Sequence, residues 1–225
     1  MNFRLLDYAL DKTTERQLME LDSAAQKVRD GVRAQAEEAV RTVLDLSKQN
    51  LTAAIYLVGL WEVNGEHIPK DPEQGWKEIQ TAADKNFGPA IYEIALRSIQ
   101  LPNPSPKSWE RMKWAARMGS VQAQFLLGDR YERGDGVTAD TERSKDYYRL
   151  CAVRGQPSCQ VHLAKLLFEA PDRAVGDYEQ AVAWYQIAAS GGVPEALQLV
   201  EREKGKLTPA QEKHIAVLAR QLSGK

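Results

Sequence analysis

The feature that most constrains the fold is a short pattern of small residues that returns four times along the chain. Each copy holds a pair of small residues, a Gly or Asn just after the pair, and another small residue further on. The copies are Ala82-Ala83…Asn86…Ala90, Ala115-Ala116…Gly119…Ala123, Cys151-Ala152…Gly155…Cys159 and Ala188-Ala189…Gly192…Ala196. Gly and Asn tolerate the left-handed backbone that ends a helix, and small residues let two helices approach closely. The pattern therefore predicts repeated antiparallel helical hairpins.

Residues that favour helix starts recur in phase with this pattern. An acidic residue stands eleven positions before three of the small pairs: Asp71, Asp140 and Asp177. Asp71 and Asp177 are followed three residues later by Gln, as in a capping box, and Ser105-Pro106 takes this place one residue out of register. These residues predict where the second helix of each hairpin begins.

The spacing of the hairpins defines the expected organisation. The residues that open successive first helices, Ala54, Ala90, Ala123, Cys159 and Ala196, are 36, 33, 36 and 37 residues apart. A unit of this length cannot bury its apolar stripe alone, so neighbouring units must stack. We expect an all-α, right-handed α-α solenoid with repeats at 54–89, 90–122, 123–158 and 159–195. Residues 1–53 are expected to form a helical cap with a degenerate repeat, and residues 196–225 to form C-terminal capping helices, the last of them starting at Thr208.

The third unit carries the fullest signature. Residues 123–137 read AQFLLGDRYERGDGV, with Asp140, Tyr147-Tyr148 and Gly155 downstream. In these residues the unit closely resembles the Sel1-like repeat, a longer relative of the tetratricopeptide repeat. The resemblance covers about residues 54–196 and is weakest in the second unit, where the Pro-rich segment 101–106 replaces the inter-helix loop. Proteins of this family are mainly adaptors, scaffolds and inhibitors of partner proteins. The resemblance therefore implies protein binding rather than catalysis, and no cofactor.

The two cysteines, Cys151 and Cys159, occupy facing small-residue positions across Gly155. Some secreted bacterial Sel1-like proteins are similar in placing paired cysteines at this spacing, and paired small positions in a hairpin satisfy the distance that a disulfide needs. The alternative is two buried thiols in a cytosolic protein. A bridge would indicate an oxidising compartment, the periplasm or the exterior, whereas free thiols would indicate the cytoplasm. The first ten residues have neither the basic start nor the apolar core of a signal peptide, so we expect any such signal to be absent from this sequence.

Composition argues against several classes of function. Thirty Lys and Arg balance 31 Asp and Glu, which is unlike the basic excess of nucleic-acid-binding proteins. No run of about 18 apolar residues predicts a membrane span. The three histidines, His67, His162 and His214, lie on different elements, and neither a metal site nor a catalytic motif is predicted. The turn around Gly134-Asp135-Gly136 is interpreted as a repeat loop rather than an ion site.

The predicted binding surface is the stripe of each first helix that is left free by the repeat core. First helices usually line the concave, binding face of a stacked array. The stripe comprises residues four apart in each unit: Leu57 and Trp61, Glu93 and Arg97, Leu126 and Arg130, His162 and Leu166. Trp and Arg are common at interface hot spots. The alternative is that some of these side chains pack against neighbouring repeats.

Two functions fit this surface. The resemblance includes periplasmic immunity proteins that neutralise secreted toxins, and a short repeat array fits that class. The alternative is a scaffold or regulatory adaptor in a cell-envelope or signalling complex.

Overall fold

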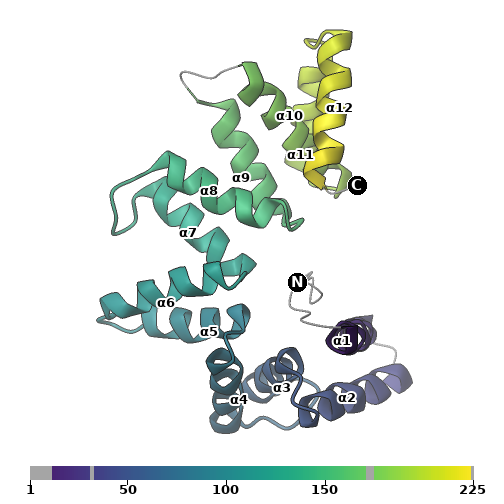
Figure 1. The fold of residues 1–225 in the computed structure, drawn as a ribbon, viewed down its shortest axis with the longest axis vertical. Coiled ribbons are helices and arrows are strands. Elements are labelled where there is room, and N and C mark those ends of the chain that lie inside the picture. The colour runs from purple at the N-terminus through teal and green to yellow at the C-terminus, as the bar shows by residue number, and fades with distance from the viewer. Residues whose placement is uncertain (1–11, 31–32, 171–174, 224–225) are drawn as a thin grey trace. The chain divides into compact units, whose positions relative to one another are not determined.

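A computed structural model describes residues 12–30, 33–170 and 175–223, and every regular element in these segments is an α-helix. The N-terminal part of the predicted cap, residues 1–11, lies outside the described residues. The helices, shown in Figure 1, are α1 (Lys12–Asp30), α2 (Arg33–Lys48), α3 (Thr52–Asn64), α4 (Pro72–Asp84), α5 (Gly88–Ile99), α6 (Pro106–Arg117), α7 (Val121–Arg133), α8 (Thr141–Ala152), α9 (Pro157–Phe168), α10 (Val175–Ser190), α11 (Pro194–Lys204) and α12 (Pro209–Ser223).

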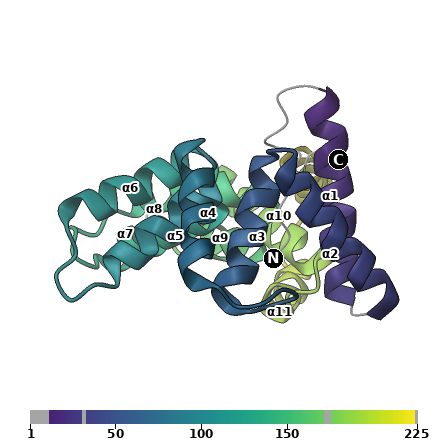
Figure 2. The ribbon, with the colours of Figure 1, turned by 90° about the horizontal axis from the view of Figure 1, so that it is seen from below.

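The helices fall into two compact units, residues 1–120 and residues 121–225. In the first unit α1 packs on α2, α3 on α4 and α5 on α6, and each pair also packs on the next (Figure 2). Its core extends from Leu21 and Val43 in the first pair to Ile79 in α4, all fully buried.

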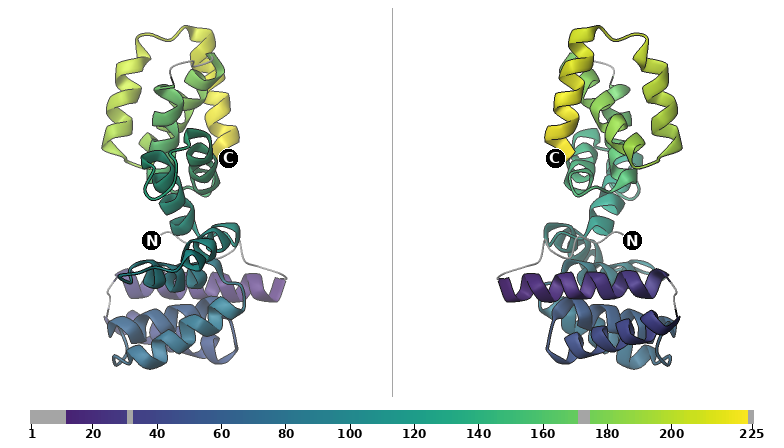
Figure 3. Two further views of the ribbon diagram at one scale, coloured as in Figure 1. Left: turned by 90° about the vertical axis from the view of Figure 1, so that its left-hand side faces the viewer. Right: turned by 90° about the vertical axis from the view of Figure 1, so that its right-hand side faces the viewer.

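The second unit is built from the same kind of pair. Helix α7 packs on α8, α8 on α9 and α9 on α10, and α10 then packs against both α11 and α12 (Figure 3). Tyr148, Leu163 and Trp184 are the large side chains of this core. The architecture is the all-α solenoid that the sequence predicts.

The turns between hairpins have the predicted backbone. The φ angles of Asn86, Gly119, Gly155 and Gly192 are 61°, 86°, 81° and 83°, and Asn50 before the first pair has 69°. Each first helix begins two residues before the small residue that opens it, as at Thr52 and Ala54. The repeat phase read from the sequence is therefore the phase of the helices.

The small residues lie where paired helices meet. Ala82, Ala115, Cys151 and Ala188 are at most 1% exposed, and so are the five residues that open the first helices. A Cβ added at Gly128 of α7 would lie 2.7 Å from the ring of Tyr148 in α8. The helices therefore approach too closely for larger side chains at these positions.

Most of the predicted caps are present. Asp71 accepts a hydrogen bond from the backbone N–H of Gln74 at 3.1 Å, and Asp140 accepts one from Arg143 at 3.0 Å. Thr208 and Gln211 form a reciprocal capping box at the start of α12. The prediction for Asp177 was wrong in position, because α10 already includes Val175 and places Asp177 inside its first turn. An acid there still interacts favourably with the helix N-terminus.

Candidate functional site: the outward stripe of the first helices

The eight residues of the predicted stripe differ in exposure. Trp61 and Arg130 are buried, at 4% and 9% exposure, whereas Arg97 is exposed and the other five are half-buried. The stripe is therefore a surface only in part, and Trp61 and Arg130 contribute to the packing of the repeats themselves.

Trp61 and Arg130 stabilise the loops that follow their helices. The Trp61 ring packs edge-on against His67, with ring centroids 5.0 Å apart. The Arg130 guanidinium donates to the backbone carbonyls of Asp135 at 2.8 Å and Gly136 at 3.2 Å. Burial lowers the pKa of Arg130 from its ordinary value. These contacts explain the turn around Gly134-Asp135-Gly136 as a repeat loop.

In the first unit the stripe borders an open groove. The Arg97 guanidinium lies 4.3 Å from the centroid of the Trp76 ring, a cation–π contact between α5 and α4. The groove has a volume of about 480 Å³ and is lined by Pro72, Glu73, Trp76, Lys77, Gln80 and Arg97. One turn before Arg97, Glu93 is 3.5 Å from the hydroxyl of Tyr56. Burial raises the pKa of Glu93, and the hydrogen bond from Tyr56 opposes that effect.

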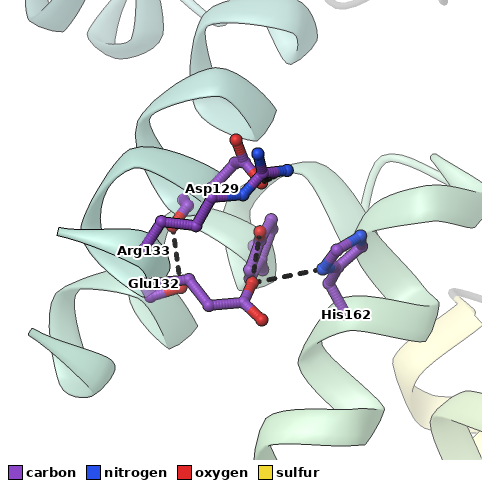
Figure 4. Close-up of polar contacts among 7 residues, drawn as sticks. Asp129, Glu132, Arg133 and His162 are labelled. Carbon is purple, nitrogen blue, oxygen red and sulfur yellow. Dashed lines mark hydrogen bonds and ion pairs between the residues drawn. The ribbon is translucent and has the colours of Figure 1, made fainter. Parts of the chain in front are cut away.

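In the second unit a polar cluster joins α7, α8 and α9, as Figure 4 shows. The Tyr148 hydroxyl donates to Glu132 Oε2 at 2.7 Å, and the same oxygen lies 3.2 Å from Nδ1 of His162. Phe125 packs against the rings of both Tyr148 and His162. Burial, reinforced by the hydrogen bond to Glu132, raises the pKa of Tyr148, so its phenol remains a donor.

An acidic and a basic side chain lie beside this cluster. Asp129 and Arg133, one turn apart on α7, form an ion pair at 2.7 Å beside Glu132 (Figure 4). Leu126 of α7 and Leu166 of α9 are half-buried. A partly exposed surface of this kind offers hydrogen-bonding groups and apolar contacts to a protein.

Cys151 and Cys159 are joined by a disulfide, the first of the two alternatives that the sequence leaves open, with Cα atoms 5.8 Å apart. The bridge links the end of α8 to the start of α9, and both residues are fully buried. It therefore fixes the hairpin that carries Tyr148 and His162.

Sequence reasoning missed two features of this site. Glu132 was not singled out, although it stands nearly one turn after Asp129 and points toward His162 (Figure 4). A second small-residue position, seven residues before each small pair, was also overlooked. It holds Gly75, Ser108, Ser144 and Ala181, all buried. Aligning the second helices on their small pairs would have revealed it.

Residues 12–30, 33–170 and 175–223 contain no group of three or more His, Cys, Asp or Glu side chains arranged to hold a metal ion. None of the helices described combines the length and apolar character that a membrane crossing requires.

Comparison with known proteins supports the repeat assignment. The Sel1 repeat family model matches residues 52–86, 121–152 and 157–193. The chitin synthase regulator SKT5 of Saccharomyces cerevisiae is 28% identical over 181 residues, which are 74% of this chain and 26% of that protein. The chain thus spans about a quarter of the length of this curated relative.

Solved structures with low sequence identity share the fold. A Sel1 repeat protein from Oxalobacter formigenes matches with a TM-score of 0.63 and 22% identity, over 96% of this chain and 92% of the other. An immunity protein from Pseudomonas aeruginosa matches with a TM-score of 0.60 and 19% identity, over 97% of this chain and 86% of the other. The helical hairpins in phase, the left-handed turns and the family match agree, and the chain carries Sel1 repeats at these three segments.

Proposed function

We propose that this protein binds one partner protein through the exposed part of its first-helix stripe and acts as an immunity protein that neutralises a secreted toxin. The Sel1 solenoid is a protein-interaction fold, and binding is the coarse function that it supports. The observation that carries the finer proposal is the likeness to the Pseudomonas aeruginosa immunity protein, which extends over nearly the whole of both chains.

The exposed stripe has the composition of a binding surface. It offers Arg97, which stacks on Trp76 of α4, in the first unit, and the half-buried side chains of Leu126, His162 and Leu166 in the second. Arg and aromatic side chains held in place by packing lose little entropy when a partner binds.

The proposed compartment is the periplasm. The disulfide between Cys151 and Cys159 supports it, because such bonds persist in oxidising compartments. Intact mass after alkylation of protein from the native host tests this point. A bridged protein adds no alkyl groups before reduction and two after it, whereas two groups added before reduction would move the protein to the cytoplasm.

The function is tested by co-expression with the products of adjacent genes, because toxin and immunity genes are usually neighbours. We expect one adjacent product to form a one-to-one complex by native mass spectrometry and to lose its toxic activity in proportion to the complex formed. A partner that binds but keeps its activity would replace the inhibitor with the second candidate.

That second candidate is a regulatory adaptor, favoured by the 28% identity to a chitin synthase regulator. An adaptor would bind two or more proteins at once without blocking an enzyme. Stoichiometry and residual activity in the same experiment therefore separate the two.

A further inference from the structure

Helix α6 of the first unit exposes an aromatic side chain that its own packing does not require. Trp114 is 42% exposed. The inward face of α6 is instead supplied by Ser108, Met112, Ala115 and Ala116, all buried. Trp114 therefore presents a large apolar surface to water on a helix whose inward face is already packed.

Helix α6 as a whole is strongly basic. The helix carries four cations, Lys107, Arg111, Lys113 and Arg117, against one acid, Glu110. Glu110 pairs with Lys113 at 2.9 Å. The charge of Arg117 also acts on Glu110. The helix therefore has three more cations than acids.

These side chains form one surface. Positions 107, 111, 114 and 117 are spaced by three or four residues, so they follow one another along the helix. Glu110, three residues after Lys107 and four before Trp114, lies on the same side of the helix, so this surface holds three cations and one acid. The residues at positions 107, 111, 114 and 117 are all exposed. We call Lys107, Arg111, Trp114 and Arg117 the α6 face.

The neighbouring repeat shows that the α6 face is not a requirement of the fold. The residue just before the small pair is Trp114 in α6 and Thr81 in α4, and both are exposed. Thr81 is polar and donates a hydrogen bond to its own helix, to the carbonyl of Lys77 at 2.9 Å. A polar residue therefore suffices at this register for the hairpin to form.

We propose that the α6 face docks an acidic amphipathic segment of a protein partner, whose apolar side chains cover Trp114 and whose carboxylates pair with Arg111 and Arg117. Trp and Arg together are the composition of interface hot spots, and charge complementarity supplies orientation and rate. The α6 face lies outside the first-helix stripe, so this docking site does not rest on the neutralisation of a toxin.

Two other anionic partners fit the α6 face less well. Nucleic-acid binding draws on an extended basic surface, whereas the whole chain has a net charge of -1. Membrane-surface binding needs a broad apolar stripe, and Trp114 is the one large exposed apolar side chain described on α6.

The test is fluorescence anisotropy with a labelled synthetic peptide that forms an amphipathic helix. Its Leu residues recur every three or four positions along one face, and its Glu residues occupy the other face. We expect the full-length chain to bind it and to lose about tenfold in affinity on Trp114→Ala, and at least as much on Arg111→Glu. Raising the salt concentration should weaken peptide binding by the wild type more than peptide binding by Arg111→Glu. Thr81→Ala and Lys48→Glu, at exposed positions of the same unit, are the matched controls and should leave binding unchanged.

Three outcomes would overturn the proposal. They are failure to bind the acidic peptide, equal binding of a peptide with Gln in place of Glu, and preferential binding of single-stranded DNA or of vesicles of equal parts phosphatidylglycerol and phosphatidylcholine. Circular dichroism of each variant distinguishes a lost contact from a lost fold. Neutralisation of a toxin by Trp114→Ala tests the earlier proposal separately, since that variant keeps the first-helix stripe.

Discussion

The second repeat, made of α5 and α6, and the third, made of α7 and α8, bury small residues at the same registers. Ala90 and Ala115 in one, and Ala123 and Cys151 in the other, are all fully buried. The family model nevertheless matches the third repeat and not the second, over residues 121–152. The buried small residues and left-handed turns therefore suffice for the hairpin, while the signature residues of the third repeat add to it.

What each repeat adds is different. The third carries the disulfide and the Glu132–Tyr148–His162 cluster, which fix its helices to α9. The second has neither, and instead exposes Trp114 among cations. A repeat that departs from the common pattern without losing its scaffold is a place to look for a specific contact.

The largest expected effect on stability comes from giving the third repeat the small residues that the second repeat has at the positions of the two cysteines. The double substitution Cys151→Ala and Cys159→Ala replaces the disulfide by the Ala pair of the second repeat. We expect the free energy of unfolding to fall by roughly 2–3 kcal/mol, mainly because the unfolded chain gains freedom. Urea denaturation monitored by circular dichroism measures this. Loss of helicity in the folded baseline would show that the small-residue scaffold does not suffice.

The next effect concerns the pair Gly128 and Tyr148. Their equivalents in the second repeat are Ala95 and Met112, both fully buried. Gly128→Ala should destabilise the protein by roughly 1–3 kcal/mol, because the new methyl group meets the tyrosine ring. Adding Tyr148→Met should recover part of this loss by copying the second repeat.

A double-mutant cycle makes that comparison quantitative. The coupling between the two substitutions should be favourable and at least about 0.5 kcal/mol, as for residues in direct contact. Additive effects would mean that the two repeats do not pack their helices in the same way.

The smallest effect concerns a first-helix position where the repeats differ. Glu62 in α3 occupies the register at which the third repeat buries Tyr131. Burial, together with the charges of Glu78 and Asp71, raises the pKa of Glu62, and its Oε2 has no hydrogen-bond partner. A carboxyl whose pKa is raised on folding binds more protons in the folded state. Its ionisation therefore reduces stability as pH rises from the unfolded pKa through the folded one.

Glu62→Gln should accordingly stabilise the protein at pH 7 by less than about 1 kcal/mol, given the partial exposure of the side chain. The gain should vanish below the ordinary pKa of a glutamate. Thermal unfolding across the acidic pH range measures the difference. A stabilisation that does not depend on pH would rule out the electrostatic cause.

The helices could be predicted from the sequence because their determinants are local and repeated. Asn86 and Gly155 define turns by residue type, and Asp71 and Asp140 define helix starts. The binding surface was harder to predict, because the exposure of a side chain depends on whether the loop after its helix folds back over it. Trp61 and Arg130 occupy stripe positions in the helical pattern, yet the loops that follow their helices fold back and bury them.

The most direct test of protein binding through the first-helix stripe is the dissociation constant of the purified one-to-one complex for three variants. Leu126→Ala and Leu166→Ala shorten half-buried side chains of the stripe, and Arg130→Ala removes a buried one. Binding through the first-helix stripe predicts that the two leucine variants weaken binding by about tenfold or more, whereas Arg130→Ala mainly lowers stability. Unchanged affinity in both leucine variants, with their folds intact, would contradict binding through the first-helix stripe.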